Sequence, residues 1–298
     1  MARFALVVSM KNVYELNGFD KNLVQKLKSS DILIIVCQDL KTYEYISKTL
    51  KVPRDITFYI VHMKKVGLSK GRNEGINFLL NQEIPCDYVL FPNLLTVYPD
   101  STLNFLRNSV LINKNILYIG SWIDKNYGIL MMPHFNYNKL MKFSRIYEPS
   151  MVVPLDCFKE GFRFDPRIGT GAKTMLQSGE GSDLVYRLFK KGYQVNGSRE
   201  IVAMNPGTSR DLGLWKSTLK AFKYGYGNGG FYAHHAAIIN YPAVLIRLVA
   251  PFLAYIFGKK YWRTEGLIFS GVSTLGRIFG FICEIISKCF SPSTKYQR

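Results

Sequence analysis

Two carboxylates stand at the start of an expected helix, in the stretch 179–183, which reads Gly-Glu-Gly-Ser-Asp. Leu184 and Leu188 give the residues that follow an apolar face, so we expect a helix that begins near Glu180. Carboxylates in the first turn of a helix are stabilised by its free N–H groups and its dipole, which is one explanation of the pattern. The other explanation is functional, because carboxylates can accept and donate protons, and Glu180 and Asp183 are spaced to lie on the same side of the helix.

The elements that must position these acids follow from the hydrophobic pattern of the first half. Strands that alternate with helices predict an α/β fold, with a mainly parallel sheet and helices on its faces. Ligands of such sheets bind at the carboxyl ends of the strands, so the loops after the strands are the expected binding positions. Strands are expected at 4–8, 32–37, 56–61 and 88–91, and helices at 19–27, 43–50 and 72–80.

Polar residues follow three of these strands. Asp39 comes after the second strand, where a nucleotide base is commonly bound, although Asp also suits an ordinary turn. The stretch 67–73 comes after the third strand and reads Gly-Leu-Ser-Lys-Gly-Arg-Asn. Its Arg72 and Asn73 either hold a ligand or cap and solvate the start of a helix. The stretch 92–95, after the fourth strand, reads Pro-Asn-Leu-Leu.

In order and spacing, these stretches resemble three motifs of family 2 glycosyltransferases, most closely the bacterial enzymes that build capsular, exopolysaccharide or O-antigen repeats. The resemblance covers roughly residues 1–230 and includes Gly-Thr-Gly-Ala at 169–172 and Tyr-Gly-Tyr-Gly at 224–227. It implies the GT-A fold, a three-layer nucleotide-binding domain. It also implies transfer of one sugar from a UDP- or GDP-linked donor to a glycan, with a lipid-linked acceptor expected.

The same resemblance suggests a role for each candidate residue. Trp215 is expected either to stack on a sugar or to pack in the core, which is the usual place of a single aromatic side chain. The candidates are Glu180 and Asp183 for catalysis, Asp39, Lys70, Arg72, Asn73 and Asn93 for the donor, Arg199 and Arg210 for the diphosphate, and Gly169, Thr170, Gly171 and Trp215 for the acceptor side.

The sequence departs from the family at the metal and base positions. The family's Asp-rich cluster holds Mg²⁺ or Mn²⁺ against the donor diphosphate, but this chain has Asn-Leu-Leu at 93–95. The family's Glu-Asp pair is reduced to Glu-Gly at 180–181, and its His before a Pro is Asn205. We therefore assign no metal-binding residue, while Mg²⁺ or Mn²⁺ remains the cofactor that the family would use.

Two explanations of these losses stay open. In the first, the protein is a metal-independent, inverting enzyme in which Lys or Arg replaces the cation and Glu180 is the base. In the second, the protein is a degenerate relative without turnover, which acts as a membrane-bound scaffold or partner in a glycan-assembly complex.

Composition limits the classes of partner that the protein could bind. The chain of 298 residues holds 39 Lys and Arg against 21 Asp and Glu, a net charge of +18 that suits nucleic acid, a nucleotide or an acidic membrane surface. No helix-turn-helix, zinc-finger or RNP-like signature is present, so we expect no nucleic-acid partner. The five cysteines are scattered without a Cys-x-x-Cys pair, which favours a reducing compartment. His234 and His235 are adjacent, so one metal ion cannot readily bind both.

The chain changes character near residue 206, and we expect a GT-A-like domain at 1–205 and a basic, helical region at 206–298. Residues 199–298 hold 13 Lys and Arg against 4 Asp and Glu. The apolar stretch 241–257 is short for a bilayer span, which needs about 20 residues.

The last apolar segment predicts an amphipathic helix. Apolar residues recur at four-three spacing between Ile268 and Ile286, with charged residues on the other side. Such a helix either packs on the domain or lies in the membrane interface, and a spanning hairpin is a third possibility. We expect attachment to the cytoplasmic face of the cell membrane, peripheral or monotopic, through residues 240–290, with anionic headgroups as partners.

Overall fold

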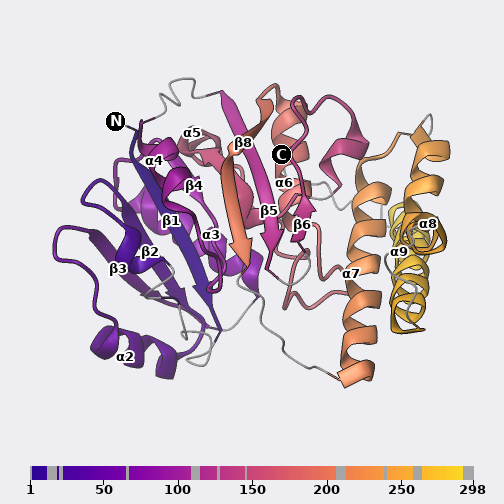
Figure 1. The fold of residues 1–298 in the computed structure, drawn as a ribbon, viewed down its shortest axis with the longest axis horizontal. Helices are drawn as coiled ribbons and strands as arrows, with labels where there is room; N and C mark the ends of the chain where they lie inside the picture. The colour runs from indigo at the N-terminus through magenta and orange to yellow at the C-terminus, as the bar shows by residue number, and fades with distance from the viewer. Residues whose placement is uncertain are drawn as a thin grey trace.

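The computed structural model describes residues 2–11, 19, 23–64, 67–108, 115–125, 128–144, 146–205, 213–237, 240–257 and 264–290. Within these ranges the chain forms an eight-stranded sheet with helices packed on it, and three long C-terminal helices lie along one side of the molecule (Figure 1). The strand order is β3-β2-β1-β4-β7-β5-β6, and β8 pairs with β5.

The first four strands form a parallel half-sheet. Neighbouring strands in this half pair in parallel, in the order β3-β2-β1-β4. Every residue of β1, β2 and β4 is buried, which continuous apolar runs allow when layers cover both faces of a sheet. All four strands confirm the predicted ones to within two residues. They are β1 (Phe4–Met10), β2 (Ile32–Cys37), β3 (Thr57–His62) and β4 (Tyr88–Leu90).

The second half of the sheet is mixed. Strand β7 (Met151–Pro154) is antiparallel to β4 and to β5 (Ile116–Asp124). Strand β6 (Gly128–Met131) is antiparallel to β5, whereas β8 (Gln194–Asn205) is parallel to it. The expected α/β fold with a mainly parallel sheet is therefore confirmed, with two antiparallel strands that the sequence patterns did not predict.

Two of the three helices predicted in the first half are present, and they begin three and four residues earlier than predicted, at Leu40 and Leu68. Helix α3 starts at Leu68, before the predicted residue 72, because Gly67 adopts a φ of 96° and a Cβ there would lie 2.8 Å from the backbone of Gly171. Of the helix predicted at 19–27, Phe19 is helical and Val24–Lys26 forms the 3₁₀ helix η2. The other elements are α2 (Leu40–Thr49), α3 (Leu68–Asn81), α4 (Asp100–Asn108), η3 (Leu140–Phe143), η4 (Glu148–Ser150), α5 (Leu155–Lys159) and α6 (Glu180–Lys191).

Two of the three C-terminal helices cross at very short range. A Cβ at Gly229 would lie 2.0 Å from the carbonyl oxygen of Arg277, and a Cβ at Gly280 would lie 2.1 Å from that of Tyr226. Only glycine allows backbones to approach this closely. The crossing joins α7 (Gly213–His235) to α9 (Thr264–Phe290), and α8 (Tyr241–Phe257) packs against α9.

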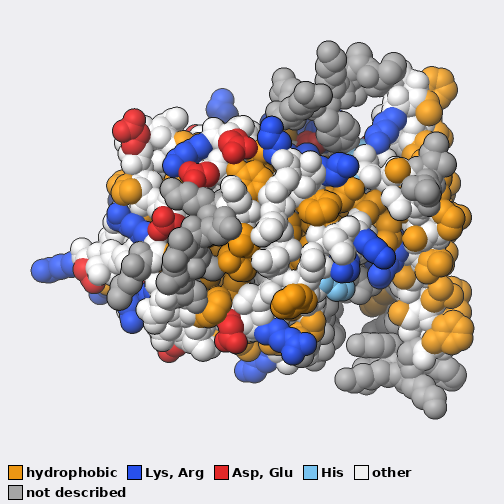
Figure 2. Space-filling view, turned by 90° about the horizontal axis from the view of Figure 1, so that it is seen from above, with side chains coloured by type: hydrophobic (Ala, Val, Ile, Leu, Met, Phe, Trp, Pro, Cys, Tyr) orange, Lys and Arg blue, Asp and Glu red, His pale blue; other side chains and the backbone are white. Residues whose placement is uncertain are grey.

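The predicted amphipathic helix is present in α9, and its apolar stripe is the exposed side. Leu275 and Phe279 are 52% and 53% exposed, while Gly276 and Gly280 are buried against α7. Figure 2 shows apolar side chains gathered along the edge that α8 and α9 form. The stretch Gly266–Phe290 is long and apolar enough, by length and composition alone, to cross a membrane. A helix that packs on a soluble domain normally buries its apolar stripe, whereas α9 exposes this stripe to the outside.

Candidate active site

The side chain of Arg72, in the second turn of α3, lies at the carboxyl ends of the parallel strands. It is buried there against acidic side chains. Its Nη1 lies 3.4 Å from Oε1 of Glu180, and its Nη2 lies 3.6 Å from Oε2 of Glu148. Nη2 also lies 3.5 Å from Oδ1 of Asn93, and the ring of Phe164 faces the guanidinium at 5.3 Å. One cation is therefore shared by two carboxylates, which we call the Arg72 cluster (Arg72, Glu148 and Glu180).

The topology explains why these residues meet. Helix α3 follows β3 and Asn93 follows β4, so both lie at the carboxyl ends of parallel strands. Strand β7 runs antiparallel to β4, with Val152 opposite Leu90. Glu148, in the short helix before β7, therefore comes to the same edge as Asn93, although the two are far apart in sequence.

The surroundings of Glu180 raise the pKa of its carboxyl group. Burial and the nearby negative charge of Glu148 raise the pKa of Glu180 to about 7, and the positive charge of Arg72 partly offsets them. A base is most effective when its pKa lies near the operating pH. The predicted helix start at Glu180 is confirmed, and the residue is buried in the site rather than solvated at a helix end.

The carboxylate of Asp183 is held by two neighbouring side chains. Its Oδ1 lies 2.8 Å from Nε2 of His235, and its Oδ2 accepts a hydrogen bond from Nε of Arg187 at 2.9 Å. Burial alone would raise the pKa of Asp183, but the hydrogen bond from His235 and the charge of Arg187 hold it down at about 2. Both oxygens are thus engaged, one by His235 on α7 and the other by Arg187 on α6 itself, which supports a structural role for Asp183. A role of Asp183 in catalysis stays a prediction.

The neighbouring histidines point to different partners, as expected for adjacent helical positions. His235 contacts Asp183, whereas Nε2 of His234 lies 2.9 Å from Oε2 of Glu284 on α9. Among the residues described, no group of three or more His, Cys, Asp or Glu side chains could hold a metal ion.

Gly169, which the sequence predicts for the acceptor side, lies beside Glu180 of the Arg72 cluster. A Cβ at Gly169 would lie 2.7 Å from Oγ of Ser69 and 2.9 Å from the carboxyl carbon of Glu180. The carbonyl oxygen of Thr170 accepts a hydrogen bond from the backbone N–H of Leu68 at 3.0 Å, which fastens this loop to the start of α3. Oγ1 of Thr170 lies 3.4 Å from Oη of Tyr224 on α7.

Three predicted donor residues lie at the same edge with other contacts. Asp39 caps α2 by accepting a hydrogen bond from the backbone N–H of Thr42 at 3.0 Å, as the turn explanation required. The amide of Asn73 bonds the backbone of Phe164 twice, at 2.8 and 2.9 Å, and so fastens α3 to that segment. Lys70 is exposed on α3. Their roles in donor binding stay predictions.

Two of the remaining candidates, Arg199 and Trp215, are exposed. Arg199 is exposed within β8, six residues before the strand ends at Asn205, or about 20 Å along an extended chain. The structure therefore does not support Arg199 as a diphosphate ligand. Arg210 lies outside the described residues. Trp215 is 77% exposed near the start of α7, so its core interpretation is wrong and its stacking role stays a prediction.

Sequence reasoning missed two residues near the site. Glu148 belongs to no motif, and only its place before a buried strand could have drawn attention to it. Lys11 follows β1, and its Nζ lies 2.8 Å from the position that a Cβ of Gly171 would take. Trp122, for which the sequence predicts either stacking on a sugar or base or packing in the core, is buried and stacks on Tyr147, with ring centroids 5.7 Å apart.

The described residues at 93–95 do not fit the divalent cation that the family resemblance implies. Hard cations prefer several oxygen ligands, and Asn93 supplies the single side-chain oxygen of this stretch. That oxygen already faces the guanidinium of Arg72, and Leu94 is buried. The cation that this oxygen faces in the structure is therefore the Arg72 guanidinium.

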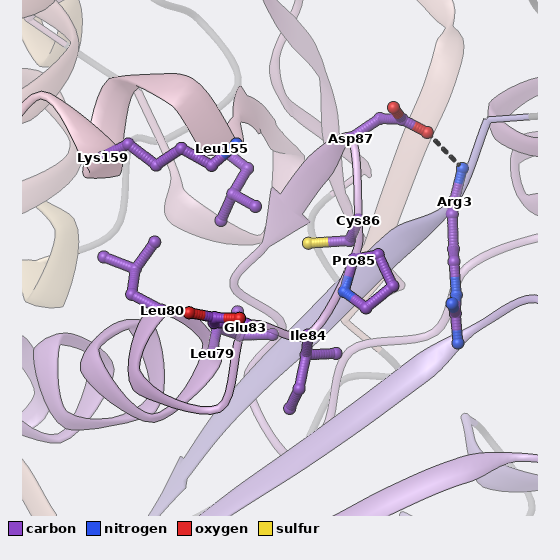
Figure 3. A pocket seen from close by; sticks show the side chains of 10 residues that line it. All are labelled: Arg3, Leu79, Leu80, Glu83, Ile84, Pro85, Cys86, Asp87, Leu155 and Lys159. Carbon is purple, nitrogen blue, oxygen red and sulfur yellow. Dashed lines mark hydrogen bonds between the residues drawn. The ribbon is translucent and has the colours of Figure 1, made fainter.

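A separate hollow of about 800 Å³ lies at the opposite edge of the sheet (Figure 3). Arg3 and Asp87 line it, and they directly precede β1 and β4, so the hollow is at the amino ends of these strands. The backbone N–H of Arg3 donates a hydrogen bond to Oδ2 of Asp87 at 2.8 Å. No acid of the Arg72 cluster lines this hollow. We therefore place the candidate site at the carboxyl ends of the parallel strands.

Solved structures share this fold, although no family model and no curated protein matches the chain. The mannosyltransferase PcManGT from Pyrobaculum calidifontis, in complex with GDP-Man and Mn²⁺, is similar with a TM-score of 0.56 and 10% identity over 99% of this chain and 82% of that one. S. aureus TarS 1-349 in complex with UDP-GlcNAc is similar with a TM-score of 0.52 and 10% identity, over 99% of this chain and 93% of that one.

These similarities define the class of fold. The chain has the α/β fold of glycosyltransferases, and the similar structures are complexes with nucleotide sugars. The match extends over nearly the whole chain, including the C-terminal helices.

Proposed function

We propose that this protein is a glycosyltransferase that moves one sugar from a nucleotide-diphosphate donor to a hydroxyl group of a lipid-linked glycan, in surface polysaccharide synthesis. The observation that carries the proposal is the Arg72 cluster, at the ligand-binding edge of a glycosyltransferase fold. The resemblance to family 2 motifs at 67–73 and 179–183 supports the same activity.

The chemistry follows from the properties of Glu180. Glu180 accepts the proton of the acceptor hydroxyl while the acceptor oxygen bonds to the anomeric carbon of the sugar. The bond between that carbon and the diphosphate oxygen breaks, and its electron pair leaves with the nucleoside diphosphate. A single displacement of this kind inverts the anomeric configuration.

The departing diphosphate requires positive charge, which lysine and arginine side chains can supply without a metal. Arg72 lies in the cluster itself, while Lys70 is exposed on the same helix. Lys11, which follows β1, lies close to Gly171 in the stretch 169–172. We therefore propose that binding of the nucleotide does not depend on Mg²⁺ or Mn²⁺.

The second candidate function is a scaffold without turnover. The replacement of the acidic cluster by residues 93–95 favours it, because the similar mannosyltransferase structure contains Mn²⁺. A transfer assay separates the two: purified protein is mixed with labelled UDP- and GDP-sugars and a lipid extract. Transfer by the wild type that Glu180→Gln abolishes supports the enzyme. Glu200→Gln, an exposed carboxylate on β8, is the matched control. Nucleotide binding without transfer supports the scaffold.

We also propose that residues 240–290 attach the protein to the cytoplasmic face of the membrane. The exposed apolar side chains of α8 and α9 support this attachment. A hollow of about 220 Å³ beside α8 is lined by His134, Lys142 and Arg247 and by no acidic residue, which suits anionic headgroups. Lys259, Lys260 and Arg263, which stand between the two apolar stretches in the sequence and would suit the same headgroups, lie outside the described residues. A membrane-bound enzyme would meet a lipid-linked acceptor at the bilayer surface.

A further inference from the structure

We propose that Glu148 replaces the acid that is missing at position 181 and acts through Glu180 as the positioning carboxylate of the catalytic base. This inference rests on the proposed glycosyl transfer and specifies how its base is built. In the family motif, the second acid follows the first in the chain. Here it comes from η4, more than thirty residues earlier in the chain.

The geometry at Gly181 carries the proposal. A Cβ at Gly181 would lie 2.7 Å from Oε1 of Glu148 and 3.0 Å from Sδ of Met151. A side chain at position 181 would therefore point into the space that the Glu148 carboxylate fills. The backbone N–H of Gly181 donates a hydrogen bond to the same oxygen at 2.9 Å. Glycine at 181 thus makes room for Glu148 and also fixes it.

The other oxygen of Glu148 links it to the base. Oε2 lies 3.6 Å from Nη2 of Arg72, whose Nη1 lies 3.4 Å from Glu180. Both side chains are largely buried, with 13% of Glu148 and 6% of Glu180 exposed. The charged and titratable groups that face Glu180 come from three elements: Arg72 on α3, Glu148 on η4 and Tyr224 on α7.

These contacts define what Glu148 does in the reaction. Two buried acids that share one guanidinium do not both ionise as readily as isolated acids, because like charges repel. The negative charge of Glu148 therefore makes Glu180 a stronger base. When the acceptor oxygen bonds to the anomeric carbon, the hydroxyl proton goes to Glu180, and the bond to the diphosphate breaks with its electron pair on the leaving group.

The first test follows the titration of Glu180 and needs no substrate. Protein labelled with ¹³C at the glutamate carboxyl carbon is titrated by NMR, with the Glu180 signal assigned from Glu180→Gln. Glu148→Gln keeps the shape of the side chain and an oxygen that can accept the Gly181 hydrogen bond. We expect its loss of charge to lower the Glu180 midpoint by about one pH unit. An unchanged midpoint overturns the proposal.

The second test moves the carboxylate back to α6. Glu148→Ala empties the space, and Gly181→Asp in the same chain refills it. We expect the double variant to restore the Glu180 midpoint and part of the transfer rate, whereas Glu148→Ala alone lowers kcat about 10- to 100-fold with the donor KM unchanged. Gly181→Asp alone should lower Tm, because the two carboxylates then compete for one space. A double variant no better than Glu148→Ala overturns the proposal.

The two tests separate this inference from the proposed function. If the wild type binds no nucleotide sugar and transfers none, the proposed function fails, whatever Glu180 does in the titration. If the wild type transfers sugar and Glu148→Gln does so equally well with the same pH profile, the inference fails and the proposed function stands.

Discussion

Nε2 of His235 lies 2.8 Å from Oδ1 of Asp183, so helix α7 is fastened to the helix that begins with Glu180. Arg187 holds the other oxygen of Asp183, and the carboxylate is almost fully buried. Because Glu180 lies one turn before Asp183 on α6, this link sets the position of the proposed base.

Replacing His235 by alanine should therefore destabilise the protein and reduce its activity together. Loss of the buried hydrogen bond is expected to lower the free energy of unfolding by about 1–3 kcal/mol. Urea unfolding measures the change, with His134→Ala, an exposed histidine, as the control. If the two variants unfold alike, the link between α6 and α7 does not stabilise the protein as described.

The pKa of Glu180 predicts the pH dependence of transfer. A base must be deprotonated, so kcat/KM should rise about tenfold per pH unit below pH 7 and level off above it. The initial-rate profile between pH 5 and 8.5 tests this, and a flat profile contradicts the role of Glu180.

The same pKa affects folding with a defined sign. The pKa of Glu180 is raised in the folded state from its ordinary value of 4.5 to about 7, so the folded protein binds more protons in this window. Its contribution to stability is therefore full below about pH 4.5 and is lost as pH rises towards 7. Glu180→Gln, which does not titrate, should weaken this dependence of Tm on pH.

Arg72→Met should be most damaging at high pH. Removal of the guanidinium leaves two buried carboxylates without their shared cation, which is expected to cost about 3–5 kcal/mol of stability when both are ionised. At pH 5, protonation of Glu180 relieves part of this cost. Tm measured at pH 5 and pH 8.5 tests the difference, with Lys70→Met on the exposed side of α3 as control. Equal losses at both pH values would rule out a charge-based role for Arg72.

The strands of the first half could be predicted because their signal is local. Continuous apolar runs such as 32–37 suit strands that are buried on both faces, and they mark β1, β2, β3 and β4 closely. The strands of the second half, such as β7 and β8, were not predicted from continuous apolar runs. Strand β7 has four residues, and β8 includes a stretch around Arg199 where its register with β5 shifts.

The site was predicted only in part for a similar reason. Arg72 and Glu180 lie in motifs whose spacing is visible in the sequence. Glu148 comes to them through the antiparallel pairing of β7 with β4, which no local pattern reveals. Arg199 was chosen because it lies near the missing His, but β8 places it within the strand rather than at its carboxyl end. Trp215 shows that an aromatic residue on a long helix need not face a core.

The exposed stripe of α9 predicts binding to anionic membranes. Changing Leu275, Phe279 and Ile282 together to serine should abolish flotation with vesicles that contain phosphatidylglycerol, because the interface gains its energy from buried apolar area. Tm should change less than membrane binding, since about half of each of these side chains is already exposed. The control changes Leu40, Tyr45 and Met175, which are exposed on the sheet domain, to serine. A triple α9 variant that still floats with the vesicles contradicts the attachment.

The most direct measurement is calorimetric titration of the purified protein with UDP and with GDP, each in EDTA and in Mn²⁺. An α/β glycosyltransferase site in which arginine and lysine replace the metal should bind one of these nucleotides in EDTA, with similar affinity when Mn²⁺ is present. Binding that requires Mn²⁺, or no binding of either nucleotide in either condition, would contradict it.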